Sequence, residues 1–187
     1  MNKQKVILSL LCFAVFIFLA VGSTGGNDEP KSTTEDAAPK DVAEETASMP
    51  ETFEEEVEAV ILKLLKETTN TDKPRIVLVV HDEDEEGEFL QAMLNADDNF
   101  TTDYIKRSIW MKSKELFEAL YALDSNVDYI SLFWALPLVD TYGNVSDKDV
   151  VIISLDRETA DKVNWENVLT DNIPVIANTY WQHPALD

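Results

Sequence analysis

Two histidines and one acidic run are the side chains of this chain best suited to metal or acid–base chemistry. His81 opens the acidic run that ends at Glu88, and His183 lies about 100 residues further on, so the histidines form no ligand-spaced pair. With Asp82 as its first position, the run resembles the start of a calcium-binding loop, but Met93 stands where position twelve requires a bidentate glutamate. We therefore expect no dedicated metal site and only weak divalent-cation binding. The competing interpretation is a charged turn that keeps a sheet edge from pairing with other molecules.

Motifs that would indicate covalent or phosphate chemistry do not occur in the sequence. The only cysteine, Cys12, lies inside an N-terminal apolar run, and the five glycines form no phosphate-binding loop. Carboxylate pairs occur throughout a chain with 36 acidic residues, so their presence identifies no active site. We predict no catalytic residue, no cofactor and no metal ligand. A hydrolase that uses a metal or two carboxylates is the alternative, and two-acid chemistry would require one buried carboxyl with a raised pKa.

Aromatic side chains are the stronger functional signal. The chain has four tryptophans and five tyrosines, residue types that dominate the energetics of protein interfaces. Two segments expected to be loops carry several of them, and loops on a rigid scaffold often display function. The predicted partner contacts are Tyr142, Asn144, Tyr180, Trp181 and His183. Packing against the core is the alternative role of these residues.

The charge of the chain limits its partners. The formal net charge is −21 at pH 7, with 36 acidic and 15 basic residues. Such a surface repels nucleic acid and anionic lipid and attracts cations. We expect no nucleic-acid partner, and we expect membrane contact only through the N-terminal segment if it is not cleaved.

The N-terminus is typical of an export signal. Lys3 and Lys5 precede an apolar run from Val6 to Val21, and small residues follow it. Residues 1–22 are therefore predicted to be a signal peptide cleaved before Ser23, or else an N-terminal membrane anchor. Residues 23–51 are rich in Ser, Thr, Ala, Pro and acidic residues, which predicts a disordered acidic tether.

Residues 52–187 are predicted to form a single α+β domain. Apolar periodicity and capping residues indicate the order helix, strand, strand, helix, strand, strand, helix, with about four strands in a mainly antiparallel sheet and the helices packed on it. The predicted elements are a helix over 52–68, strands over 75–80 and 89–96, a helix over 101–123, strands over 129–138 and 150–155, and a helix over 157–164.

The segment from Val127 to Asp156 is expected to form the centre of that sheet. Two runs rich in Ile, Val, Phe, Trp and Tyr flank a turn that contains Gly143, which predicts an antiparallel hairpin. Alternation along the first run places Trp134 on one face and Phe133 on the other. We expect Trp134 to be buried in the core.

Short fragments of the C-terminal part resemble a family of small exported proteins of Gram-positive bacteria and their mobile elements. The fragments are Asn99–Thr102, Leu132–Trp134, Pro137–Leu138, Tyr142–Asn144, Arg157–Thr159, Asn164–Asn167, Tyr180–Trp181 and His183–Pro184. The resemblance runs from about Pro74 to the end and implies a bacterial host and an exported location. It assigns no functional residue.

These observations predict an extracytoplasmic protein, either secreted or tethered to the cell membrane. We expect a non-catalytic binding module of the cell envelope whose partner is an envelope protein, a peptide or a glycan. The hydrolase acting outside the membrane remains the alternative.

Overall fold

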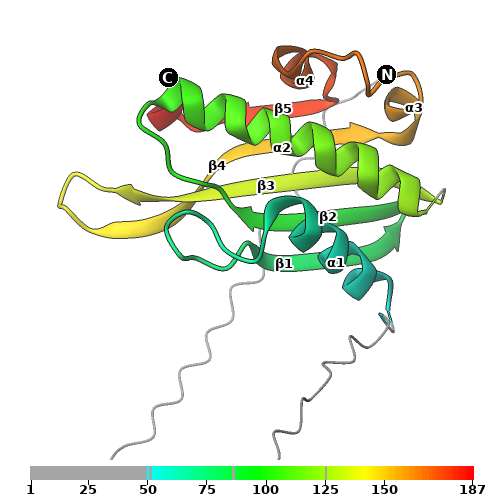
Figure 1. Ribbon diagram of the computed structural model, residues 1–187, viewed down its shortest axis with the longest axis horizontal. Helices are drawn as coiled ribbons and strands as arrows, with labels where there is room; N and C mark the ends of the chain where they lie inside the picture. The colour runs from blue at the N-terminus through cyan, green and yellow to red at the C-terminus, as the bar shows by residue number, and fades with distance from the viewer. Residues whose placement is uncertain (1–49, 51, 86, 125) are drawn as a thin grey trace, which may run out of the picture. The chain divides into compact units, whose positions relative to one another are not determined.

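The computed structural model describes Pro50 and residues 52–85, 87–124 and 126–187 (Figure 1). The predicted signal peptide or anchor and nearly all of the predicted tether lie outside these residues. Among the described residues, no helix is both long enough and apolar enough to span a bilayer.

Within the described ranges, five strands form one mixed sheet, and their order across the sheet is their order along the chain. The strands are β1 (Ile76–Asp84), β2 (Gly87–Asn95), β3 (Val127–Val139), β4 (Val145–Asp156) and β5 (Thr179–Gln182). Neighbouring strands are antiparallel except β2 and β3, which are parallel. The α+β class and the mostly antiparallel sheet are thus confirmed. The fifth strand is an addition to the four that the sequence predicted.

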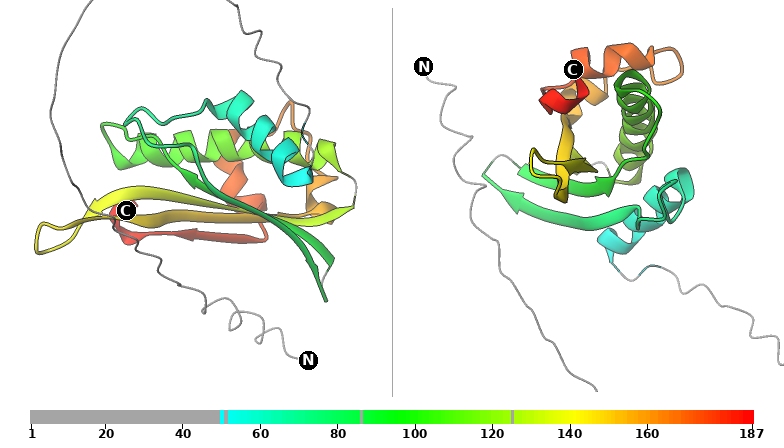
Figure 2. Two further views of the ribbon diagram at one scale, coloured as in Figure 1. Left: turned by 90° about the horizontal axis from the view of Figure 1, so that it is seen from below. Right: turned by 90° about the vertical axis from the view of Figure 1, so that its left-hand side faces the viewer.

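The described part of the chain contains four α-helices, and two of them are long. They are α1 (Phe53–Leu65), α2 (Thr102–Leu123), α3 (Arg157–Ala160) and α4 (Ile173–Ile176). Single 3₁₀ turns occur at Thr170–Asn172 and Pro184–Leu186. Helices α1 and α2 both lie over the same face of the sheet (Figures 1 and 2), and α2 makes the crossover that a parallel β2–β3 pair requires.

The two long helices begin where their capping residues predict. The Thr52 hydroxyl accepts a hydrogen bond from the Glu55 backbone N–H at 3.2 Å, and Thr101 does the same for Tyr104 at 3.3 Å. Each helix then buries a stripe of apolar side chains against the sheet, as helical periodicity requires. Helix α3 is shorter than predicted, because the chain turns after Ala160 and Asn164 caps a further turn by accepting from the Asn167 N–H.

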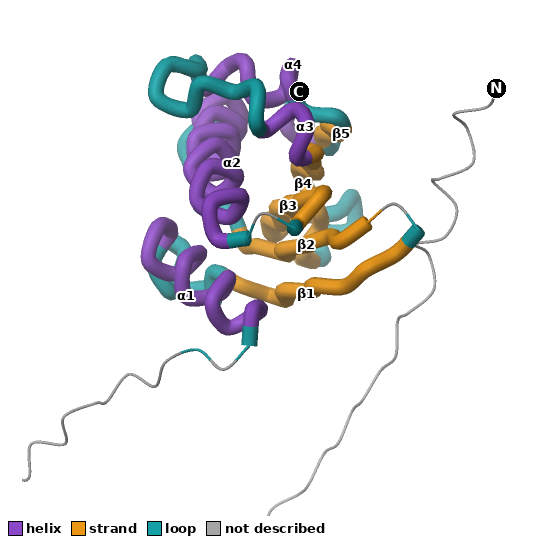
Figure 3. The backbone as a smooth tube through the Cα atoms, turned by 90° about the vertical axis from the view of Figure 1, so that its right-hand side faces the viewer, coloured by secondary structure: helices purple, strands orange, loops and turns teal. Residues whose placement is uncertain are grey.

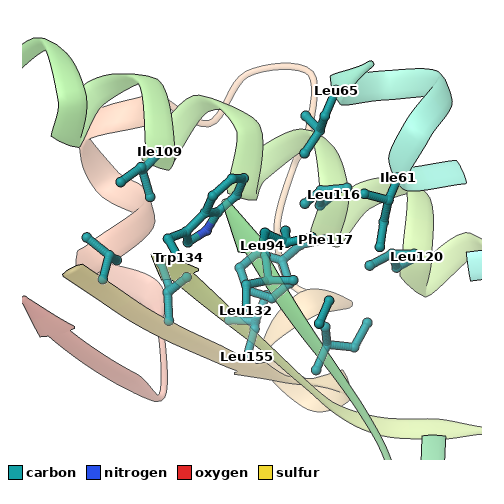
Figure 4. Packing of buried hydrophobic residues seen from close by; sticks show 14 of the residues in the cluster. Ile61, Leu65, Leu94, Ile109, Leu116, Phe117, Leu120, Leu132, Trp134 and Leu155 are labelled. Carbon is teal, nitrogen blue, oxygen red and sulfur yellow. The ribbon is translucent and has the colours of Figure 1, made fainter. Parts of the chain in front are cut away.

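The core lies between α1, α2 and the sheet, as Figure 4 shows for ten labelled side chains. Trp134 is fully buried, and its indole Nε1 donates to the Ser113 hydroxyl of α2 at 2.9 Å. The expected burial of Trp134 is therefore confirmed. This contact also fixes the faces of β3, since Trp134 points to α2 and Phe133 must point away from it.

Two glycines with positive φ allow a direct test of backbone strain. Gly87 (φ 123°) starts β2, and a Cβ there would lie 2.1 Å from the Asp128 Oδ2 atom, which accepts the Glu88 N–H. Gly143 (φ 84°) lies in the β3–β4 turn with open space around it. We expect Gly87→Ala to lower the free energy of unfolding by about 2–3 kcal/mol and Gly143→Ala by about 1 kcal/mol. Equal losses in chemical denaturation would contradict a role for the Asp128 contact.

Candidate binding surface

Five apolar side chains form a continuous row across all five strands, one from each strand. The register pairs Leu78 with Met93, Met93 with Phe133, Phe133 with Ile152, and Ile152 with Trp181. We call this set the apolar row. Because cross-strand partners lie about 5 Å apart and point to the same side, the row is one uninterrupted apolar strip.

The apolar row lies on the face of the sheet opposite α1 and α2. No helix among the described residues covers this face, and we call it the helix-free face. Phe133 is the neighbour of Trp134, which points to α2. Trp181 is likewise the neighbour of Tyr180, whose hydroxyl accepts a hydrogen bond from Trp110 Nε1 of α2 at 3.1 Å. Alternation along each strand therefore turns Phe133 and Trp181 away from the helices. Figure 2 and the labelled tube of Figure 3 show α1 and α2 together on the other side of the sheet.

The ends of the row are the most exposed. Leu78 on edge strand β1 is 47% exposed and Trp181 on edge strand β5 is 42% exposed, whereas the three middle residues are partly buried. The adjacent row of the same face is polar at its centre, where Ser131 and Ser154 share a hydrogen bond of 2.9 Å between their hydroxyls. The helix-free face is thus apolar along one strip and not over its whole area.

A cavity of about 320 Å³ opens beside the row, where β2 ends and β3 and β4 continue. Its apolar wall includes Met93 and Phe133, and its polar wall includes Asp147 and Asp149. Partial burial raises the pKa of the Asp149 carboxyl above its ordinary value. The Asp147 carboxylate, in contrast, forms an ion pair with Lys73. The strip therefore borders two carboxylates in different environments.

Two of the predicted contact residues, Trp181 and His183, lie together at the β5 edge. Their ring centroids are 5.9 Å apart in an edge-to-face arrangement. His183 Nδ1 accepts the Ala185 N–H at 3.0 Å, which caps the final 3₁₀ turn. Tyr180 is half-buried on the helix side, where its hydroxyl donates to Gln182 Oε1 at 2.9 Å and burial raises its pKa. Trp181 is thus the predicted contact that reaches the helix-free face.

The other two, Tyr142 and Asn144, lie at the tip of the β3–β4 hairpin, which projects beyond the rest of the sheet (Figure 1). Tyr142 is 89% exposed. The Asn144 side chain donates to Asp140 Oδ2 at 3.1 Å, and Asp140 also accepts the backbone N–H groups of both residues. Asn144 therefore closes the turn. About six residues of β4, roughly 20 Å at 3.3 Å per residue, separate this tip from Val151, which pairs with β5.

The histidine of the acidic loop contacts a carboxylate and an aromatic ring. His81 Nε2 lies 2.6 Å from Glu88 Oε1, and its ring packs edge-on against Phe53 with centroids 4.6 Å apart. Among the residues that the structure describes, no group of three or more His, Cys, Asp or Glu side chains could hold a metal ion.

Four members of the row, Leu78, Met93, Phe133 and Ile152, were not identified as contact candidates from the sequence. Each lies in a predicted strand, and Met93, Phe133 and Ile152 each lie between two buried neighbours. Alternation would have placed them on the second face of their strands. The alignment of the five strands into one strip depends on register, which the sequence alone does not reveal.

The fold and this surface define an α+β protein with a five-stranded mixed sheet, two long helices on one face and an apolar strip on the other. Comparison with family models, curated proteins and solved structures finds no match to the chain. The resemblance to small exported proteins therefore remains a prediction from short motifs.

Proposed function

We propose that this protein is a non-catalytic binding module that holds a partner on its helix-free face. The observation that supports the proposal is the apolar row, which crosses every strand of the sheet with exposed ends at Leu78 and Trp181. A sheet usually buries its apolar strips against another layer. An apolar strip that is bordered by polar residues and that no described element covers is typical of an interaction surface.

The proposed place of action is outside the cytoplasm, at the cell envelope. The N-terminal sequence supports it, with its basic start, its apolar run and the acidic segment that follows. We expect mass spectrometry of the protein from its host to find a mature terminus at Ser23. Recovery of intact Met1 in the membrane fraction would indicate an anchor instead.

Binding through the helix-free face makes different predictions for two exposed aromatic residues. We expect Trp181→Ala in the full chain to weaken capture of an envelope partner by about 10-fold, because truncation of an aromatic interface contact commonly costs about 1–2 kcal/mol. Tyr142→Ala is the matched control, since Tyr142 is exposed but lies on the distant hairpin tip. Quantitative pull-down from envelope extracts, with thermal melting to check folding, measures both. Equal behaviour of the two variants would contradict the proposed surface.

One observation favours the alternative, a two-carboxylate hydrolase. Asp147 and Asp149 are two residues apart on β4, so they lie on the same face, about 7 Å apart along the strand, beside the 320 Å³ cavity. The raised pKa of Asp149 and the ion pair that holds Asp147 would suit an acid and a base. Hydrolysis of envelope glycans or peptides that is abolished by Asp149→Asn, with folding unchanged, would support the enzyme over the binding module.

A further inference from the structure

We propose that the occupant of the helix-free face is a cationic amphipathic helix supplied by a partner protein. This inference rests on the proposed function and names the chemistry of the partner. The dimensions of the apolar row, the distribution of charge around it and the layering of the fold support it.

The dimensions of the row match a short helix. Five strands leave four interstrand spacings of about 4.8 Å, so the row is about 19 Å long. A helix rises about 1.5 Å per residue, so roughly 13 residues would follow the row from Leu78 to Trp181. Such a helix would present apolar residues at three- and four-residue spacing to the strip. It would also add a layer opposite α1 and α2.

Acidic positions lie to both sides of the row on the same face. Alternation places Asp82 and Asp84 toward one end of β1, while Asp147 and Asp149 lie beyond the row on β4. Among the described residues, the one lysine or arginine within a strand is Lys148, which pairs with Leu136 on the opposite face and also lines the cavity. A helix with lysine or arginine beside its apolar stripe would place positive charge near these carboxylates.

The environment of the β4 carboxylates strengthens this argument. Asp147 is already paired with Lys73, whereas Asp149 faces the cavity and is partly desolvated. A cation from the partner would stabilise the charged form of Asp149 at this place. The net charge of −21 would in addition attract a cationic segment over a longer range.

The same charges disfavour two other occupants. A second copy of this chain would bring two sets of acidic residues together across the interface, and each copy carries a charge of −21. An anionic lipid surface would be repelled for the same reason. A partner of opposite charge therefore fits the surface best.

The test uses the full chain and three synthetic helical peptides of about 14 residues. The first has a leucine stripe flanked by lysines, the second has the same composition in scrambled order, and the third has glutamate in place of lysine. Isothermal titration calorimetry, supported by tryptophan fluorescence, measures binding. We expect the first peptide to bind at least 10-fold more tightly than the scrambled peptide, and the glutamate peptide not to bind.

Two pairs of substitutions separate local from long-range electrostatics. Asp147→Asn with Asp149→Asn removes two charges beside the row, and Glu115→Gln with Glu118→Gln removes two exposed charges on α2, on the other side of the sheet. The first pair should weaken binding of the lysine peptide about 10-fold and reduce its salt dependence, whereas the second pair should change it less than about 2-fold. Equal effects of the two pairs would overturn the inference.

Two apolar variants separate failure of this inference from failure of the proposed function. Phe133→Ser and Trp181→Ala should each weaken binding of the lysine peptide at least 10-fold, and Trp181 lies at a sheet edge, where truncation leaves the core intact. If neutral helices or glycans bind more tightly and the same variants abolish that binding, the cationic partner is wrong and the binding face stands. If sedimentation shows a dimer that Phe133→Ser dissociates, a second copy occupies the face and the inference fails. If neither variant alters binding of peptides or envelope partners, both proposals fail.

Discussion

Replacing Trp134 by alanine is expected to lower the free energy of unfolding by about 3–5 kcal/mol, the usual cost of emptying a buried aromatic site. Trp134 is fully buried between β3 and α2. Its truncation would leave a cavity, and it would also leave the buried Ser113 hydroxyl without the indole N–H donor that lies 2.9 Å away. Equilibrium denaturation with an unchanged m-value would measure the loss.

Two control variants test whether the loss of stability in Trp134→Ala comes from the burial of the indole ring. Trp134→Phe keeps most of the apolar volume and removes the hydrogen bond, so it should cost less than Trp134→Ala and should remain folded if the alanine variant does not. Trp181→Ala removes the same side-chain type from a site that is 42% exposed and should cost less than about 1.5 kcal/mol. A larger loss for Trp181→Ala than for Trp134→Ala would contradict the assignment of core and surface.

Replacing Asp97 by alanine is expected to cost about 3 kcal/mol, because it would leave two cations without their shared partner. Arg75 is 2% exposed and donates to Asp97 Oδ1 at 2.9 Å, while Lys112 of α2 pairs with Asp97 Oδ2. Arg75 also donates to the Asn95 carbonyl at 2.7 Å and to the Thr68 carbonyl at 3.2 Å. The cluster therefore ties the start of β1 and the end of β2 to α2. This loss of unfolding free energy is at the low end of the range for buried ion pairs, because the Asp97 side chain is 19% exposed.

A double-mutant cycle measures the coupling free energy between Arg75 and Asp97. Arg75→Met with Asp97→Ala should cost clearly less than the sum of the two single changes, because the double variant leaves no uncompensated charge on Arg75. Additive losses would mean that Arg75 and Asp97 act independently. Lys112 is present in all four proteins of the cycle, so its own interaction with Asp97 cancels from the coupling free energy.

The contribution of Asp97 should also depend on pH in a defined direction. Burial alone would raise the pKa of Asp97, but hydrogen bonds from Lys112, the Asn70 N–H and Arg75 together hold it below its ordinary value of 3.8. A lowered pKa in the folded state adds stability that is fully present well above pH 3.8 and is lost as the pH falls through the folded-state pKa. The stability difference between the native protein and Asp97→Asn should therefore be constant near neutral pH and shrink in acid. A difference that grows in acid would contradict this role.

Local patterns predicted much of the fold correctly. The caps at Thr52 and Thr101, the apolar periodicity after each of them and the two strand–turn–strand segments identified most elements. These signals are local, because a cap, a turn or an amphipathic period involves residues only a few positions apart. The burial of Trp134 followed from alternation in a strongly apolar strand.

The sequence by itself thus determined the order of helices and strands as far as α3, the central hairpin and the acidic character of the chain. Only the tertiary structure decided the parallel pairing of β2 with β3, the addition of β5 and the meeting of Arg75, Asp97 and Lys112. Each of these joins segments that are distant in sequence, and their arrangement depends on packing across the whole domain and not on any local propensity. The apolar row is the clearest case: its five members are ordinary strand residues, and register alone aligns them on the face that α1 and α2 leave uncovered.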